Sequence, residues 1–278
     1  MTQVHDLQAR PAQASIKPHN EAAAQMWGLG GRAYDNISFG VSDALAHGAQ
    51  RLNPKEGEEI LDVATGTGWT ARNAARLGAR VTAVDIAPEL LAAAQELSAH
   101  VRPPITFRQA DAEDLPFGDA SFDGVISTFG VMFAGDQEQA ARELARVCRP
   151  GGRLALVVWA PEGAIQEFWA LIGKYKPGPP PPVSPLAWGE PEHVRALLGD
   201  AFDLAFEPGV NDHFVDTVEE AWEWYARGFG PMKALVDNLP PDQLAAFKQE
   251  VDAYHASYRS EAGLHLQREY LLIIGRRR

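Results

Sequence analysis

The stretch Ile60-Leu-Asp-Val-Ala-Thr-Gly-Thr-Gly68 decides the fold. Its apolar half is typical of a buried parallel strand, and its two glycines allow the backbone after the strand to come close to a ligand. A helix predicted at 69–77 would direct its free N–H groups and the positive end of its dipole toward the same place. The stretch therefore predicts a strand, a ligand-binding turn and a helix in succession.

Short apolar runs alternate with helical stretches on both sides of this motif. The predicted strands are 58–64, 81–86, 105–110, 122–128 and 153–160. The predicted helices are 69–77, 88–100 and 136–148. Pro88 suits a helix start, and Pro150-Gly-Gly152 predicts a break before the fifth strand. The alternation predicts an α/β fold: a doubly wound, mostly parallel, seven-stranded Rossmann-like sheet that binds ligands at the carboxyl ends of its strands.

The pattern loosens after residue 160. Thr217-Val-Glu-Glu220 has the spacing of a capping box and predicts a helix start, while 241–258 predicts another helix and Glu269–Gly275 a final strand. We expect the later helices to cover the sheet edge as a cap. The predicted organisation is a flexible segment with lid helices at 1–56, a ligand-binding core at 57–160, and cap helices plus final strands at 161–278.

Composition restricts the class of protein. The chain has 278 residues, a formal charge of −12 and a single cysteine, Cys148, and no metal-ligand spacing stands out. The negative charge argues against a nucleic-acid partner. No apolar run reaches the roughly 18 residues that span a bilayer. Because the first twenty residues lack an apolar signal core and no internal disulfide can form, we expect a cytoplasmic protein. We also expect a monomer or homodimer that does not bind membranes.

Three acidic residues distinguish between two cofactors. Gly66-x-Gly68-x-x-Ala71 also satisfies the dinucleotide pattern, so an NAD(P) enzyme is an alternative. Asp62 before the glycines disfavours a pyrophosphate and suits a ligand that carries an ammonium and a sulfonium. Asp85 after the second strand can accept from a ribose diol, and Asp111 after the third from the amine of adenine. Each could instead be a helix cap, but together they favour S-adenosylmethionine.

The segment 59–160 resembles class I S-adenosylmethionine-dependent methyltransferases of the ubiquinone/menaquinone-biosynthesis-like group (methyltransferase type 11), which includes bacterial small-molecule methyltransferases. The matching runs are Ile60–Gly68, Val81–Ile86, Gln109–Phe117, Ser121–Ser127 and Arg146–Gly152. The resemblance implies methyl transfer from S-adenosylmethionine and leaves the methyl acceptor open. The family often has glycine where this chain has Ala64, which is a mild departure.

The resemblance also implies roles for individual positions. Residues around the methionine portion would be Asp62, Thr65, Gly66 and Gly68. Asp85 would bind the ribose, and Ile86 would pack on the adenine. Asp111 and Ala112 would form hydrogen bonds to the edge of the adenine. Residues beside the sulfonium would be Ser127, Thr128 and Phe129. Trp27 and Tyr34 would belong to an N-terminal lid.

Methyl transfer from a sulfonium depends chiefly on holding the nucleophile close and in line. We expect an O or N nucleophile, or else C or S, on a small molecule, and no residue stands out as a base. Candidates near the methyl group are Tyr34, Phe129 and Phe133, and further aromatic candidates for the acceptor pocket are Trp159, Trp188, Trp224 and Tyr225. His193 and His213 are interpreted as ordinary surface or capping histidines. The alternatives are an NAD(P)-dependent oxidoreductase and a non-catalytic protein that binds S-adenosylmethionine.

Overall fold

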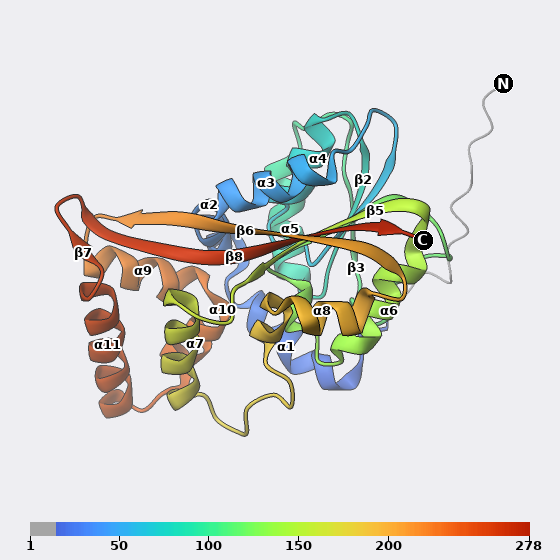
Figure 1. The fold of residues 1–278 in the computed structure, drawn as a ribbon. Helices are drawn as coiled ribbons and strands as arrows, with labels where there is room; N and C mark the ends of the chain where they lie inside the picture. The colour runs from blue at the N-terminus through green and yellow to red at the C-terminus, as the bar shows by residue number, and fades with distance from the viewer. Residues whose placement is uncertain (1–14) are drawn as a thin grey trace.

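The structure is a computed structural model that describes residues 15–278. Residues 1–14, which belong to the segment expected to be flexible, lie outside the described residues. Its centre is a mixed sheet in the order β3-β2-β1-β4-β5-β8-β6, with β7 paired to β8 (Figure 1). The strands are β1 (Glu59–Val63), β2 (Arg80–Asp85), β3 (Thr106–Gln109), β4 (Phe122–Thr128), β5 (Cys148–Trp159), β6 (Phe202–Val215), β7 (Arg259–Ser260) and β8 (Gly263–Arg277). Strands β1 to β5 pair in parallel, and β8 runs antiparallel to β5 and β6.

Helices cover the sheet and its carboxyl ends. They are α1 (Glu21–Gly28), α2 (Tyr34–Phe39), α3 (Ser42–Leu52), α4 (Trp69–Arg76), α5 (Pro88–Ser98), α6 (Gln137–Val147), α7 (Ala164–Tyr175), α8 (Pro191–Leu198), α9 (Val218–Gly228), α10 (Gly230–Asn238) and α11 (Pro241–Ala256). The strand order reverses between β1 and β4. Because right-handed crossovers on the two sides of a reversal leave their helices on opposite faces, the carboxyl ends there open into a crevice.

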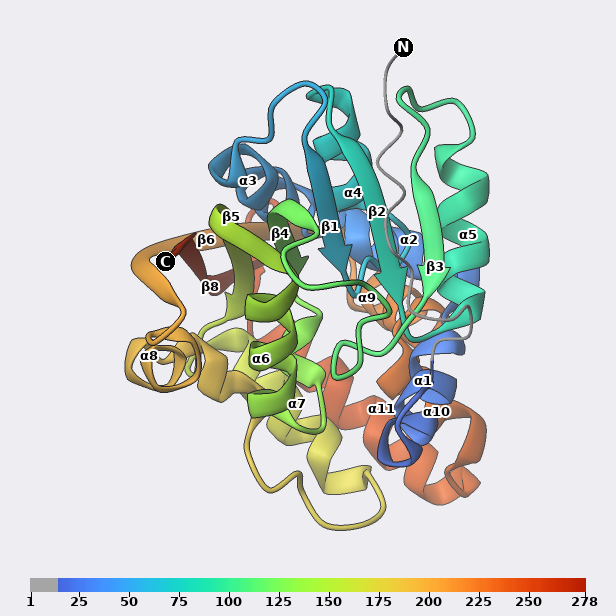
Figure 2. The same cartoon turned by 90° about the vertical axis from the view of Figure 1, so that its right-hand side faces the viewer.

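The predicted mostly parallel, doubly wound sheet is confirmed, as is its N-terminal helical cap. Strands β1, β4 and β5 are buried over most of their length, and Ile60, Val125 and Leu156 are completely buried in the core. Figure 2 shows the arrowheads of β1 to β3 pointing toward α1, α9 and α10. These helices therefore cover the edge at which a ligand is expected.

The far side of the sheet differs from the prediction. Strand β6 is one of the final strands expected within 161–278, for which no bounds were predicted. Strand β8 is twice as long as Glu269–Gly275, and the short β7 is an additional strand. Pro208 and Gly209 lie inside β6, where they resemble a turn signal; β6 tolerates them because it is the last strand of the sheet. Pro150-Gly-Gly152 likewise lies inside β5 as a local register shift, and not in front of it.

The later helices do not all belong to the cap. Helices α7, α9, α10 and α11 pack together below the sheet edge (Figure 1), whereas α8 packs against α6 and β6. The predicted helix start at Thr217 is confirmed, because its hydroxyl accepts from the Glu220 N–H at 3.1 Å. Among residues 15–278, no helix is long and apolar enough to cross a membrane.

Candidate functional site

The turn after β1 has a strained backbone that brings it close to neighbouring groups. Ala64, Gly66 and Gly68 all adopt left-handed conformations, with φ of 57°, 56° and 86°. Glycine takes this conformation without steric cost, whereas a residue with a Cβ pays about 1–2 kcal/mol. A Cβ built on Gly66 would meet the Tyr34 ring at 3.2 Å. The glycine thus leaves a narrow space between the turn and helix α2.

Asp85 at the end of β2 organises the same turn. Its Oδ2 accepts from the Gly66 N–H at 2.8 Å, and its Oδ1 accepts from the Ala87 N–H at 2.9 Å. The side chain is buried, and burial raises its pKa despite the hydrogen bonds from Ala87, Gly66 and Ile86. A carboxylate has about four acceptor sites, and these three hydrogen bonds leave one of them free. A ribose hydroxyl could therefore be bound without displacing a backbone contact.

Asp62 lies beneath the turn and has an unsatisfied buried oxygen. Its Oδ2 accepts from the Thr65 hydroxyl at 2.6 Å, whereas its Oδ1 has no hydrogen-bond partner among the described residues. Burial raises the pKa of Asp62 to about 7; the nearby Asp85 raises it further and the Thr65 hydroxyl counteracts. A buried carboxylate without a full set of donors is costly, and a cationic ligand nearby would relieve the cost.

Replacing Asp62 with asparagine should change how stability depends on pH. The folded-state pKa of about 7 lies above the ordinary 3.8, so the folded protein keeps a proton that the unfolded chain releases. Wild-type stability from this group is complete below about pH 4 and is lost as the pH rises to about 7. The stability of the variant relative to wild type should therefore grow across this window by roughly 2–4 kcal/mol, measured by denaturant unfolding of both proteins at several pH values.

Asp123→Asn is the matched control, because the pKa of Asp123 shifts in the other direction. Burial would raise it, but the Arg149 guanidinium and the Glu59 N–H, 2.5 and 2.9 Å away, lower it more. Its contribution is present above its ordinary pKa and is lost in acid, so this variant should lose stability at neutral pH and recover in acid. A constant stability difference between Asp62→Asn and wild type across the window would show that Asp62 titrates normally.

Asp35 in helix α2 is a residue that the sequence did not single out. Its Oδ1 accepts from the Thr67 hydroxyl at 2.9 Å and from the Trp69 indole N–H at 2.7 Å, and Arg72 lies 3.6 Å away. The N-terminal helices are thereby attached to the turn after β1. No local pattern signals this role, because the partners lie more than thirty residues away in the sequence.

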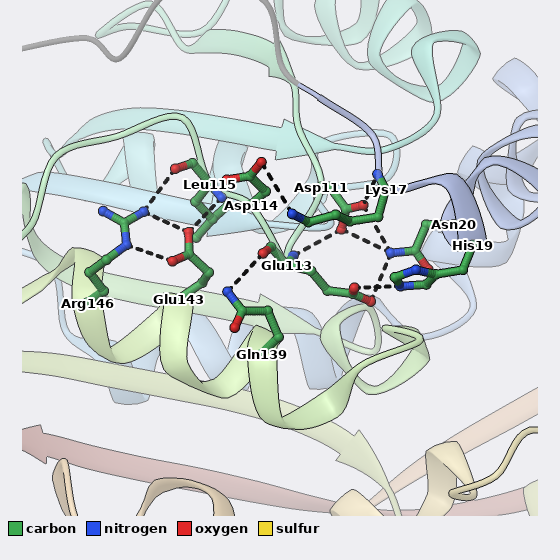
Figure 3. Close-up of polar contacts among 10 residues, drawn as sticks. All are labelled: Lys17, His19, Asn20, Asp111, Glu113, Asp114, Leu115, Gln139, Glu143 and Arg146. Atoms are coloured by element: carbon green, nitrogen blue, oxygen red, sulfur yellow. Dashed lines mark hydrogen bonds and ion pairs between the residues drawn. The ribbon is translucent and has the colours of Figure 1, made fainter.

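The N-terminal segment crosses the end of β3 and binds Asp111. Figure 3 shows His19 and Asn20 pointing toward Asp111 and Glu113, whereas the Lys17 side chain reaches toward Asp114. The Lys17 N–H donates to Asp111 Oδ2 at 3.0 Å, and the Asn20 amide donates to both carboxylates, at 3.0 Å to Asp111 and 2.8 Å to Glu113. His19 Nε2 lies 2.7 Å from Glu113. The Asp111 carboxylate is thus fully engaged by the chain itself.

The end of β4 carries a second strained position. Phe129 has φ of 55°, which is uncommon for a bulky residue and often marks a functional site. Its ring stacks on Trp159 at the end of β5, with centroids 3.9 Å apart. The neighbouring Thr128 hydroxyl bonds to that of Thr70 at 2.7 Å, and Ser127 Oγ accepts from the Val131 N–H at 3.1 Å.

One cavity joins these groups. It encloses about 1390 Å³ of space outside atoms, part of which is open to solvent. The predicted residues that line it are Trp27, Tyr34, Thr65, Gly66, Asp85, Ile86, Asp111, Ala112, Thr128, Phe129 and Phe133. Asp62, Gly68 and Ser127 do not line it and lie behind the lining. Lining residues that the sequence did not indicate include Asn20, Phe168, Trp169, Phe229 and Arg268.

Aromatic rings form the cap side of the cavity. Trp27 contacts Phe133 and Phe229, with ring centroids 5.1 and 5.7 Å apart, and Trp169 contacts both of the latter. Of the further aromatic candidates for the acceptor pocket, Trp159 and Tyr225 line the cavity. Trp188 and Trp224 do not line it. Trp188 is fully buried in the main core, because the short 3-10 helix that contains it, Pro185–Gly189, packs against β5.

The surface interpretation of His213 is wrong. It lies in β6, is buried, and its Nε2 has no hydrogen-bond partner among the described residues. Burial lowers its pKa to about 3, so the ring is neutral at pH 7. His193 is half-buried in α8 and bonds to the Gln137 side chain at 2.8 Å.

The chain is similar in sequence to known proteins. A family model described as a methyltransferase domain matches residues 61–156. A demethylmenaquinone methyltransferase of Corynebacterium kroppenstedtii is 31% identical over 186 residues, which cover 65% of this chain and 78% of that enzyme. An uncharacterised protein of Mycobacterium tuberculosis (strain H37Rv) is 32% identical over 280 residues, which cover 98% of this chain and 99% of that protein.

A solved structure extends the likeness to nearly the whole fold. The crystal structure of the [4+2]-cyclase SpnF superposes with a TM-score of 0.62 at 19% identity and covers 95% of this chain and 99% of that one. At this identity the likeness concerns the fold alone.

Proposed function

The chain belongs to the class I S-adenosylmethionine-dependent methyltransferases of the ubiquinone/menaquinone-biosynthesis-like group, and on this premise we propose that it methylates an O or N nucleophile of a small molecule. The observation that carries the proposal is one continuous cavity. It joins the turn after β1 and the carboxyl ends of β2 and β3 to an aromatic pocket under the cap. One half suits the cofactor and the other suits an acceptor.

The residues of the strand-end half fit S-adenosylmethionine, whose sulfonium supplies the methyl group. We assign the methionine portion to Thr65 and Gly66, with Asp62 and Gly68 acting from behind the lining. The unsatisfied Asp62 Oδ1 beneath this turn supports a nearby cationic ligand. The ribose belongs to Asp85, and the adenine packs on Ile86. Because Asp111 binds Asn20, we place Asn20 beside Asp111 and Ala112 at the adenine edge.

The sulfonium region belongs to the end of β4. We assign Thr128 and Phe129 to its lining, with Ser127 holding the backbone behind them. Aromatic faces attract cations, so Phe129 and Tyr34 suit the neighbourhood of a positive sulfur. Trp27 and Tyr34 serve as the lid, since they lie on the N-terminal helices over the cavity.

The proposed catalysis rests on proximity and orientation. Alignment of two reactants can lower a barrier by several kcal/mol, up to roughly 7–11. Burial raises the pKa of Tyr34, with the nearby Asp85 adding to the effect, so its hydroxyl stays protonated and does not act as a base. The chain's task is therefore to hold the acceptor atom in line with the methyl group and to exclude water. Phe133 and Trp169 form part of that apolar enclosure.

Calorimetry with S-adenosylhomocysteine tests the cofactor half, and binding is the expected result. Absence of binding at millimolar ligand would contradict the proposal. Incubation with methyl-labelled S-adenosylmethionine and a metabolite library tests the transfer: a labelled product is expected, while tight binding without any product would favour a non-catalytic protein. The charge of −12 supports a small-molecule acceptor over a nucleic acid. We also propose a cytoplasmic monomer or homodimer.

A further inference from the structure

Arg268 is a buried cation on the wall of the cavity. It lies in β8 and is 4% exposed, between Leu266 and Tyr270, which are buried on the same face of the strand. Among residues 15–278, no carboxylate lies within ion-pair distance of its guanidinium. Taking an unpaired charge out of water costs several kcal/mol. A fold that keeps such a group at the edge of a cavity therefore suggests a ligand that compensates it.

The contacts of Arg268 fix its orientation without neutralising it. Its Nε donates to the Asn211 side-chain oxygen at 2.7 Å, and Nη2 donates to that oxygen and to the Gly40 carbonyl. The Asn211 amide donates in turn to Asp43 at 2.5 Å, so the nearest acid is one side chain removed. Burial lowers the pKa of His213, and the charge of Arg268 lowers it further, as expected for a cation that still acts on its surroundings.

One donor remains free for a ligand. A guanidinium has five N–H groups, and the contacts above engage three of them. A fourth, on Nη1, points to the Tyr225 hydroxyl at 3.4 Å, a long hydrogen bond. The second hydrogen of Nη1 has no partner among the described residues. Arg268 and Tyr225, which Nη1 joins, both line the cavity.

The position within the sheet separates this group from the cofactor. In the strand order β3-β2-β1-β4-β5-β8, Asp111 and Asp85 follow β3 and β2, whereas Arg268 lies on β8. Phe129 and Trp159 stand between them, and the guanidinium lies 5.8 Å from the centre of the Trp159 ring. A molecule between the methyl group and Arg268 would thus contact aromatic rings along its length.

We propose that Arg268 and Tyr225 form an anion-binding subsite of the acceptor pocket, which takes the carboxylate of an acceptor with a flat unsaturated frame. This inference rests on the proposed function. The carboxylate serves as an anchor, and the aromatic rings of the pocket hold the frame so that a nucleophile at its other end faces the methyl group. A neutral acceptor of the same shape binds weakly, because it leaves the guanidinium without a counter-charge.

The test compares 2-naphthoate with its neutral analogue 2-naphthamide by calorimetry, using protein saturated with S-adenosylhomocysteine. We expect the carboxylate to bind at least tenfold more tightly, about 1.4 kcal/mol. Arg268→Met should abolish this preference, Arg268→Lys should keep part of it, and Tyr225→Phe should reduce it.

Several outcomes would overturn the subsite. They are equal affinity for the two probes, absence of binding by both, and a preference that survives in Arg268→Met. The wild-type comparison alone decides the matter if Arg268→Met does not fold, which its melting temperature and its affinity for S-adenosylhomocysteine report. Failure of S-adenosylhomocysteine to bind the wild type would instead contradict the proposed function, so the two failures are distinguishable.

Discussion

Replacing Asp85 with alanine should weaken the binding of S-adenosylhomocysteine by at least a hundredfold. The carboxylate holds the Gly66 and Ala87 N–H groups at 2.8 and 2.9 Å and lines the cavity where we place the ribose. Hydrogen bonds to a charged group contribute about 1.5–3 kcal/mol each, and each 1.4 kcal/mol is about tenfold in affinity. The alanine variant loses the contacts that shape the turn as well as any contact to the ligand.

Two further variants make this measurement specific. Asp85→Asn keeps one accepting oxygen but replaces the other with an amide NH₂ group, which faces a backbone N–H. Its loss of affinity for S-adenosylhomocysteine should therefore be intermediate. Asp203→Ala removes an exposed carboxylate whose one side-chain partner among residues 15–278 is Arg278, and it should leave the affinity unchanged. Calorimetry on all three, with melting temperatures as a folding check, decides the matter. An affinity of Asp85→Ala within threefold of wild type would mean that the ribose is held elsewhere.

The centre of the fold was predictable because its signals are local. The apolar run before Gly66, the helix start at Pro88 and the strand before Asp111 are each recognisable within about ten residues. Strand ends in a parallel sheet meet at one edge, so the sequence also predicted which side chains share a site. The structure brings Gly66, Asp85 and Asp111 to the same cavity.

The outer strands were not predictable in the same way. Residues 264–267 alternate apolar and polar side chains, as in a half-buried strand, and lack the continuous apolar run of a central one. The predicted strand therefore began at Glu269 and left out Arg268. The alternation of Leu266, Arg268 and Tyr270 is the signal that was available: it places a charged residue at an inward position.

Contacts between distant segments could not be predicted from the sequence. Asn20 meets Asp111 across ninety-one residues, and Asp35 meets Thr67 across thirty-two. Neither pair has a spacing or a residue type that singles it out, because asparagine and aspartate near helix starts usually cap their own helix. The sequence therefore predicted an Asp111 carboxylate available for adenine, whereas in the structure Lys17 and Asn20 already donate hydrogen bonds to this carboxylate.

Replacing Gly66 with alanine should reduce the affinity for S-adenosylhomocysteine by tenfold to a hundredfold, about 1.4–2.7 kcal/mol. A Cβ there lies 3.2 Å from Tyr34 Cε1, tighter than ordinary contact, so either the ring or the turn must move. The φ of 56° adds about 1–2 kcal/mol of strain, which the turn can release by rotating its N–H away from Asp85. Both responses disturb the wall of the cavity.

Gly173→Ala is the matched control for this substitution. Gly173 lies inside helix α7, a Cβ built on it meets nothing within 4 Å, and its φ is not in the left-handed region. The same chemical change should therefore leave the affinity unchanged and stabilise the helix by about 0.5–1 kcal/mol, because alanine is the better helix former. If both alanine variants bind S-adenosylhomocysteine like the wild type, the turn after β1 does not approach the ligand, and the assignment of the methionine portion to Gly66 fails. If only Gly66→Ala loses affinity while its melting temperature stays near that of the wild type, the loss belongs to the site and not to the fold.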